Sequence, residues 1–285
     1  LTGRHLDIEV FPLSFKEFLK FKGLEIRDDL DLIKNRFDIK RLLTEYMEFG
    51  GFPEVVLEDS KDRKLFLLNS YFNDILLKDV VKRYRIKKVN ELESLAKYYI
   101  SNISTIQSFR NISRVLNLSL HTVERFSRYM QIARLFIFLD NFRYPVKEQI
   151  RSKKKVYTID IGFYELHGFK ISENVGRRME NLVLIGLLRR SEFNPLIKVY
   201  YFRFNNKEVD FLVKEGVKIK QLIQVTYASD RDEIEKREVE NLRKAYELFK
   251  EHDPELLIIT WDYEDILKID NKEIKLIPLW KWLLI

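Results

Sequence analysis

The sequence has no cysteine and only four histidines, at positions 5, 121, 167 and 252. A disulfide framework and a thiolate metal site are therefore excluded, and the histidines are too scattered to form a pair at metal-ligand spacing. Long apolar runs are also lacking, because none reaches the roughly 20 residues that a membrane-spanning helix needs. We therefore expect a soluble, cytoplasmic protein with no membrane partner.

The chain has 285 residues, of which 46% are apolar, and this proportion is ample for a globular fold. Such a length is long for one hydrophobic core, so we expect two or three domains. Lysine and arginine number 51 against 44 aspartates and glutamates, which gives a formal net charge of +7. A basic balance suits a polyanion such as DNA, although it says nothing about the fold.

The first 90 residues carry mainly helical patterns. Ser14 and Glu17 have the spacing of a capping box, which predicts that a helix begins there. Further helices are predicted over about 38–49, where Gly50 and Gly51 end the pattern, and over about 61–83.

Residues 91–160 have the pattern of a winged helix. The predicted elements are one helix, two short helices joined by a tight turn, and two strands around a basic loop: 91–102, 108–116, 119–131, 135–139 and 155–160. Two helices joined in this way are typical of a helix-turn-helix. The basic loop between the two strands would be the wing.

The pattern changes after residue 160. The predicted order is a helix, three strands, a helix and two strands: 177–190, 198–204, 208–213, 219–227, 231–251, 256–261 and 274–277. This order predicts an α/β domain with a mixed sheet. Glu208 to Tyr227 is expected to be a hairpin with its turn at Lys214 to Lys218, and Glu180 is expected to lie near Asp210.

Eight stretches carry a resemblance to a known family: LTGRHLDIEVFPLSFKEFL, FGGFPEVV, HTVERFSRYMQIARLFIFL, KKVYTIDIGF, GRRMENLVLIGLLRR, VDFLVKEG, QLIQVTY and ELLIITWDYE. In order, and over nearly the whole chain, they resemble mostly archaeal AAA+-type P-loop ATPases that carry a C-terminal domain of unknown function. The resemblance implies a multi-domain α/β chain: the end of an AAA+ core with a helical lid (1–90), a winged helix-turn-helix (91–160) and a restriction-endonuclease-like mixed-sheet domain (161–285).

The chain departs from that family at the nucleotide site. The family holds ATP and Mg through a P-loop, Gly-x4-Gly-Lys-Ser/Thr, and none of the nine glycines has this spacing. We therefore expect no ATP or Mg cofactor for this chain alone, and we expect the missing N-terminal ATPase core as a partner. The chain opens with Leu1 rather than Met, and we expect that an N-terminal part of the protein is missing from this sequence. A removed tag or a processed start is the alternative explanation. A homo-oligomer is also among the expected assemblies.

Basic residues of the predicted winged helix are candidates for DNA contact, because cations that neutralise phosphates release counterions. They are Arg125 and Arg128 on the second helix, and Arg143, Lys147, Arg151, Lys153, Lys154 and Lys155 in the loop. Glu124 would repel phosphate. The alternatives are a solvated charged loop and a winged helix that serves only as a protein–protein module.

The resemblance also implies an arginine in the lid that senses the nucleotide γ-phosphate. Arg83 and Arg85, in the basic stretch 78–88, and Arg4 are the candidates. Such an arginine would stabilise the transferring phosphoryl group electrostatically. The alternative for the basic stretch is that cations near a helix end interact with the helix dipole.

In the restriction-endonuclease-like fold, the resemblance implies a helix Glu, a strand Asp and a Glu-x-Lys around a metal. The matching residues are Glu180, Asp210, Gln224 and Thr226. Because the last two have lost the acid and the lysine, metal binding should be weak and the proton-handling group is missing. Asp230 and Asp232 are candidate substitutes. The structural alternative for Asp210 is an ion pair with a neighbour such as Lys207.

We therefore expect the C-terminal nucleic-acid-binding and regulatory part of an AAA+-type archaeal ATPase, with a degenerate nuclease-like domain. ATP hydrolysis belongs to the family and not to this chain. One alternative is a Mg²⁺-dependent nuclease that uses Glu180 and Asp210. Another is a protein-interaction scaffold without nucleic acid.

Overall fold

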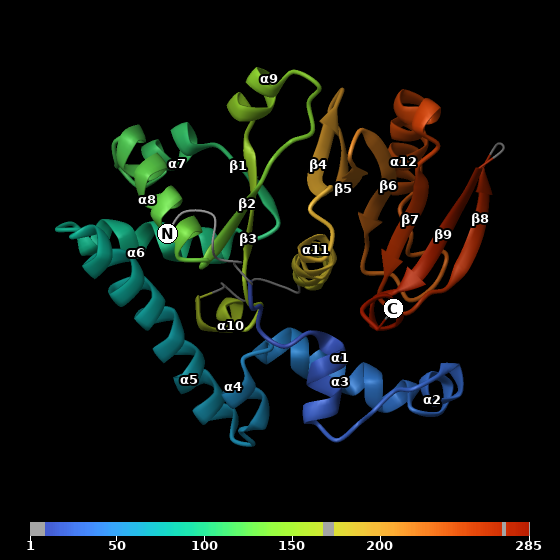
Figure 1. Ribbon diagram of the computed structural model, residues 1–285, viewed down its shortest axis with the longest axis horizontal. Coiled ribbons are helices and arrows are strands. Elements are labelled where there is room, and N and C mark those ends of the chain that lie inside the picture. The colour runs from blue at the N-terminus through green and yellow to red at the C-terminus, as the bar shows by residue number, and fades with distance from the viewer. Residues whose placement is uncertain (1–8, 168–173, 270–271, 285) are drawn as a thin grey trace, which may run out of the picture.

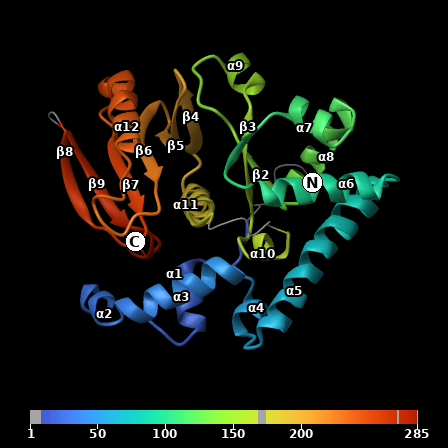
Figure 2. The ribbon, with the colours of Figure 1, turned by 180° about the vertical axis from the view of Figure 1, so that it is seen from behind.

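The computed structural model describes residues 9–167, 174–269 and 272–284. It is a mixed α/β protein with helices at the N-terminal side, a three-stranded sheet and a six-stranded mixed sheet, which confirms the predicted fold class. The two sheets lie side by side above the N-terminal helices, with one long helix between them (Figure 1), and the view from behind agrees (Figure 2). Within the described residues, none of the helices combines the length and the apolar character that crossing a bilayer requires.

The N-terminal part consists of helices. They are α1 (Phe15–Phe21), α2 (Asp29–Lys34), α3 (Arg36–Phe49), α4 (Pro53–Leu57), α5 (Lys61–Asp74) and the π-helix η1 (Ile75–Lys82). Ser14 caps α1 in the predicted capping box, because its hydroxyl accepts from the Glu17 amide while the Glu17 carboxylate accepts from the Ser14 amide. The single helix expected over 61–83 is α5 followed by η1, a change of helix type that a continuous apolar stripe does not reveal.

The end of α3 is tied to a distant part of the chain. Gly50 has a φ of 75°, and a Cβ there would lie 1.7 Å from Oδ1 of Asp160. The buried Asp160 carboxylate accepts from the amides of Gly51 at 2.7 Å and Gly162 at 2.8 Å. The two glycines that end the helical pattern therefore also allow this close approach.

The middle of the chain has the element order of a winged helix. It contains α6 (Val89–Ser101), β1 (Thr105–Gln107), α7 (Phe109–Val115), α8 (Leu120–Ile132), β2 (Phe136–Leu139), α9 (Val146–Arg151), β3 (Lys154–Thr158) and α10 (Phe163–His167). Ser108 caps α7 and Ser119 caps α8, which confirms the two short helices. The strands pair antiparallel in the order β1-β3-β2. β1 and α9 were not predicted, since both are too short to show a period.

The C-terminal part contains the six-stranded sheet. Its elements are α11 (Val175–Glu192), β4 (Ile197–Phe204), β5 (Lys207–Glu215), β6 (Lys218–Val225), α12 (Lys236–Phe249), η2 (Lys250–His252), β7 (Glu255–Thr260), β8 (Asp265–Ile269), β9 (Lys272–Pro278) and α13 (Leu279–Trp282). The strand order is β4-β5-β6-β7-β9-β8, with β6, β7 and β9 parallel. The predicted hairpin is confirmed as β5 and β6, with Gly216 in its turn. The edge strand β8 was not predicted.

The two faces of the six-stranded sheet are covered by different helices. Leu184 of α11 shares a core with Phe211 and Ile223, and α1 and α3 contribute to the same core. Leu242 of α12 shares a second core with Leu222 on the other face. A third core fills the winged helix and α5. The N-terminal helices therefore pack in one core with a sheet that lies far away in the sequence.

Candidate functional site

A buried acid cluster lies where β3 meets the six-stranded sheet. Nζ of Lys155 on β3 lies 2.8 Å from Oε1 of Glu180 on α11. It also lies 2.7 Å from Oε1 of Glu208 and 3.0 Å from Oδ1 of Asp210, both on β5. The Tyr157 hydroxyl donates to Oε1 of Glu180 at 2.5 Å. Glu180 and Asp210 are therefore close together, as predicted, but they surround an ammonium group.

Asp210 lies at an irregularity of β5. The pairing with β4 shifts register there, and the regular pairing with β6 starts only at Phe211, opposite Ile223. The Asp210 carboxylate accepts from the Val225 amide through Oδ2 at 2.9 Å and from Lys155 through Oδ1. Both oxygens of this buried acid thus have donors from the protein itself.

Burial has the largest effect on the protonation of this cluster. It raises the pKa of Glu180 to about 8, with a further increase from Asp210 and an opposing effect of Lys155. Burial also opposes the charge on Lys155, but Asp210, Glu180 and Glu208 outweigh it and hold the Lys155 pKa well above its usual range. At neutral pH the cluster therefore holds a charged lysine and a protonated Glu180.

The side chains of this cluster do not fit the metal that the resemblance implied. The Lys155 ammonium forms ion pairs with carboxylate oxygens of Glu180, Glu208 and Asp210. These are the oxygens that a divalent cation would need as ligands. Among the described residues, no group of three or more histidine, aspartate or glutamate side chains is arranged to hold a metal ion. The cluster is a charged contact between the winged helix and the six-stranded sheet, and the partner of Asp210 is Lys155 rather than Lys207.

The prediction that Lys155 contacts nucleic acid is therefore wrong. Its side chain is 3% exposed, because Lys155 already belongs to the buried part of β3. Lys154 forms an ion pair with Asp140 and is partly buried. Of the other predicted basic residues of the wing, Arg143 is partly exposed, and Lys147, Arg151 and Lys153 are exposed.

Gln224 and Thr226 lie on the α12 side of the sheet. Gln224 alternates with Ile223 and Val225, which belong to the α11 core, so its side chain and that of Thr226 point the other way. On that side Glu238 of α12 hydrogen-bonds Thr226, and burial raises the Glu238 pKa to about 7. One oxygen each of Gln224 and Glu238 is buried without a donor in the described part of the chain.

Glu238 was missed by the sequence analysis, although a signal for it exists. It stands four residues before Leu242 and seven before Ala245, and all three side chains are on the buried face of α12. An acid at such a position is unusual, since buried carboxyl groups lose the solvation of their charged form.

A basic surface is formed by α8 and by residues 82–85, at and just beyond the end of η1. The rings of Tyr84 and Tyr129 stack with centroids 3.7 Å apart and planes at 5°, which holds this end of η1 against α8. The exposed cations around the stack are Lys82, Arg83, Arg85, Arg125 and Arg128. No carboxylate of a described residue forms an ion pair with any of them. Arg4, the third candidate for nucleotide sensing, lies outside the described residues.

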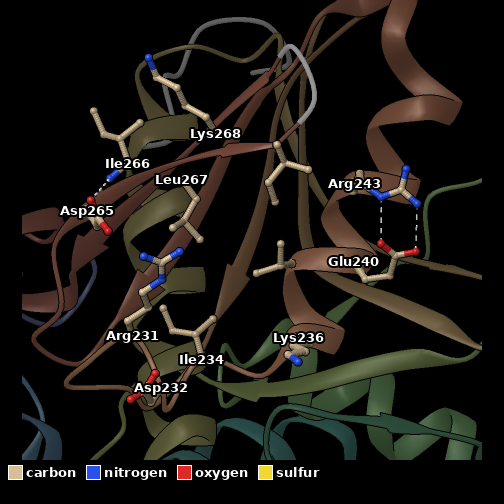
Figure 3. A pocket seen from close by; sticks show the side chains of 12 residues that line it. Arg231, Asp232, Ile234, Lys236, Glu240, Arg243, Asp265, Ile266, Leu267 and Lys268 are labelled. Atoms are coloured by element: carbon tan, nitrogen blue, oxygen red, sulfur yellow. Dashed lines mark hydrogen bonds and ion pairs between the residues drawn. The ribbon is translucent and has the colours of Figure 1, made fainter.

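An open groove of about 940 Å³ lies between α12 and β8 (Figure 3). Its rim carries both signs of charge, with Arg231, Lys236 and Lys268 against Asp232 and Asp265. This mixture does not favour an ion of either sign.

The two candidate substitute acids have other places in the structure. Asp230 accepts from the amides of Asp232 and Glu233 and so stabilises a turn. Asp232 lies on the groove rim. The structure therefore does not place either acid in the role of a substitute ligand beside Lys155.

Comparison with known proteins gives relatives but no activity. Residues 40–172 match the family model described as a domain of unknown function, DUF8612. An uncharacterized protein of Methanocaldococcus jannaschii is 35% identical over 291 residues, which cover 99% of this chain and 64% of the relative. An uncharacterized protein of Haemophilus influenzae is 28% identical over 285 residues, which cover 98% of this chain and 66% of that relative. The chain thus spans somewhat less than two thirds of each of these relatives.

Proposed function

We propose that this chain binds nucleic acid, DNA in the first place, through its winged helix-turn-helix. The observation that carries the proposal is the set of exposed cations on α8 and on residues 82–85, at and just beyond the end of η1, that have no acidic partner among the described residues. Arg125 and Arg128 lie on the second helix of the helix-turn-helix, the element that enters the major groove in proteins of this type. Lys82, Arg83 and Arg85 extend the same charge across the Tyr84–Tyr129 stack.

The physical basis is phosphate neutralisation. Each phosphate that a lysine or arginine neutralises releases condensed counterions, so affinity falls steeply with salt. Glu124 is also exposed on α8 and works against this attraction. Ser119 is not available for a phosphate contact in its present bonding, because its hydroxyl caps α8. Arginines, and not hydroxyl groups, therefore carry the proposed contact.

The role of the nuclease-like domain in this proposal is structural and regulatory rather than catalytic. Lys155 of the winged helix forms ion pairs with Glu180 and Asp210 of the nuclease-like domain, so a movement of one domain would displace the other. As a part of an AAA+-type ATPase in the cytoplasm, which the sequence resemblance implies, the chain would couple such movement to DNA. In that setting Arg83 and Arg85 would face either nucleotide or DNA.

A protein-interaction scaffold is the second candidate, and one observation favours it. Leu30, Ile33 and Phe37 on α2 and α3 are 63%, 73% and 88% exposed. Leu30 and Ile33 lie three residues apart on α2, and together with Phe37 at the start of α3 they are exposed apolar side chains that a protein partner would cover. This surface and the basic surface of α8 involve different residues, so the two functions are compatible.

The test of the DNA proposal is binding of a fluorescent duplex as a function of salt. Arg125→Ala/Arg128→Ala should weaken binding to all sequences alike and reduce the slope of log affinity against log salt by roughly two. Lys16→Ala/Lys20→Ala is the matched control, because it removes two exposed charges from α1. Equal affinity and slope for the parent and the α8 variant would rule out the proposed contact.

A further inference from the structure

The tip of the wing combines exposed apolar and basic side chains. Tyr144, Val146 and Ile150 are 70%, 67% and 68% exposed. Exposed cations Lys147, Arg151 and Lys153 stand beside them, with Arg143 partly exposed. Over residues 143–153 the only acid is Glu148. Such a surface is costly in water, and its charge is complementary to a polyanion.

The base of the wing is hydrogen-bonded to β4. The Phe142 amide donates to the Tyr201 carbonyl at 2.8 Å, and the Tyr201 amide donates to the Asp140 carbonyl at 3.0 Å. On the other side of the wing, the Tyr201 hydroxyl donates to the Lys153 carbonyl at 2.6 Å. The Phe142 ring packs on Phe249 in the α12 core. Both ends of the wing are therefore fixed, and α9 projects from the top of the molecule (Figure 1).

Within α9 the two kinds of side chain form adjacent rows. Val146 and Ile150 are four residues apart, and so are Lys147 and Arg151. Residues at this spacing lie next to each other on a helix surface. The helix thus presents an apolar row beside a cationic row on a fixed support.

We propose that α9 is a wedge that inserts Val146 and Ile150 at a base step in the minor groove of duplex DNA. Lys147 and Arg151 bind the flanking phosphates. The inference rests on the proposed DNA binding and specifies how the duplex is read. Phosphates alone do not need an apolar row, whereas bases opened at a step offer apolar faces, and apolar wedges kink DNA in this way.

The consequence is a preference for deformable sequence. Opening a base step costs free energy, and pyrimidine–purine steps such as TA open most easily. The wedge therefore predicts bending centred on such a step, without a hydrogen-bonded base contact. An anionic membrane surface would also take a basic and apolar helix, but α9 has only six residues and lies on a helix-turn-helix unit.

Two variants test the apolar row and the cationic row of α9 separately. Val146→Ser/Ile150→Ser keeps every charge, and Lys147→Gln/Arg151→Gln keeps the apolar row. The measurements are end-to-end energy transfer in a duplex with a central TA step, fluorescence of 2-aminopurine at that step, and affinity against salt. The serine variant should lose the bend and the fluorescence rise with an unchanged salt slope. The glutamine variant should lose roughly two units of slope.

Three outcomes would overturn the wedge. In the first, the parent protein binds duplex but neither bends it nor raises the fluorescence, which leaves the α8 contact intact. In the second, the serine variant bends DNA as the parent does. In the third, the parent does not bind duplex but binds vesicles of phosphatidylserine and phosphatidylcholine through α9. Loss of binding in the Arg125/Arg128 variant tests the proposed function separately.

Discussion

Three buried carboxyl groups make the free energy of unfolding of this protein depend on pH. Burial raises the pKa of Glu180 to about 8, of Glu238 to about 7 and of Asp160 to about 6. Each acid binds its proton more tightly in the folded chain than in the unfolded chain. Their contribution is therefore fully present at low pH and is lost as the pH rises through these folded-state values. We expect the free energy of unfolding to fall from about pH 4.5, the ordinary value for glutamate, to about pH 8.

Glu238 offers the sharpest test of this dependence. Glu238→Gln keeps the size of the side chain and removes its titration. At pH 8 the variant should be more stable than the parent by up to about 3 kcal/mol, since one pKa unit corresponds to about 1.4 kcal/mol. The two proteins should converge near pH 4.5, as urea unfolding at several pH values would show.

The control for this prediction lies on the same helix. Glu240 is solvent-exposed and forms an ion pair with Arg243. Glu240→Gln should change stability only slightly, and by the same amount at every pH above 4.5, because the Glu240 pKa, lowered to about 2 by Arg243 and Lys244, keeps this carboxylate charged over that range. A Glu238→Gln variant whose stability ran parallel to that of the parent at every pH would contradict the burial argument.

At the scale of elements, Lys155 joins β3 to α11 and β5. Its ammonium contacts acids on both elements, and its side chain is almost fully buried. Buried ion pairs add little net stability compared with an apolar pair, but removal of one partner leaves uncompensated charge in the interior. Asp210 and Glu208, which both contact Lys155, make this asymmetry large.

Lys155→Met should therefore destabilise the protein by roughly 3–5 kcal/mol in urea unfolding. Lys154→Met is the matched control on the same strand, since Lys154 pairs only with Asp140 in a partly exposed position. Its cost should be about 1 kcal/mol or less. Adding Asp210→Asn to Lys155→Met should recover part of the loss, because it removes one stranded charge. Equal losses in the two lysine variants would contradict the role of Lys155.

At the scale of the whole molecule, the winged helix and the six-stranded sheet are joined at two places. One is the Lys155 cluster, and the other is the contact between the base of the wing and β4. The shared core of α1, α3 and α11 adds the N-terminal helices to the same assembly. The positions of Glu180, Glu208 and Asp210 beside the six-stranded sheet are therefore set by contacts with the neighbouring parts of the chain.

This arrangement predicts that the chain does not cleave DNA. Single-stranded and duplex substrates incubated with Mg²⁺ or Mn²⁺ should show no cleavage above background, because Lys155 holds the carboxylates that a metal would need and Gln224-x-Thr226 offers no proton-handling group. Cleavage that disappears in both Glu180→Ala and Asp210→Ala would reverse this conclusion and make the site catalytic.

Structural features that depend on residues close together in the sequence could be predicted from it. The Ser14 and Ser119 caps, the helix-turn-helix and the hairpin of β5 and β6 were predicted and are present. Each depends on residues a few positions apart, where capping hydroxyls and alternating apolar residues act directly on the backbone. The pairing of Glu180 with the Asp210 region was also expected, from the packing of α11 on the sheet.

The sequence by itself thus determined the longer helices and strands, and the acids Glu180 and Asp210. Only the tertiary structure decided what those acids face. Lys155 is separated from Asp210 by 55 positions and stands at the end of a basic run, where its side chain is chemically identical to its exposed neighbours. Local propensity cannot distinguish a solvated lysine from a buried one, because burial depends on which elements pack around the strand. The same holds for the wing, whose base is hydrogen-bonded to Tyr201 of a distant strand.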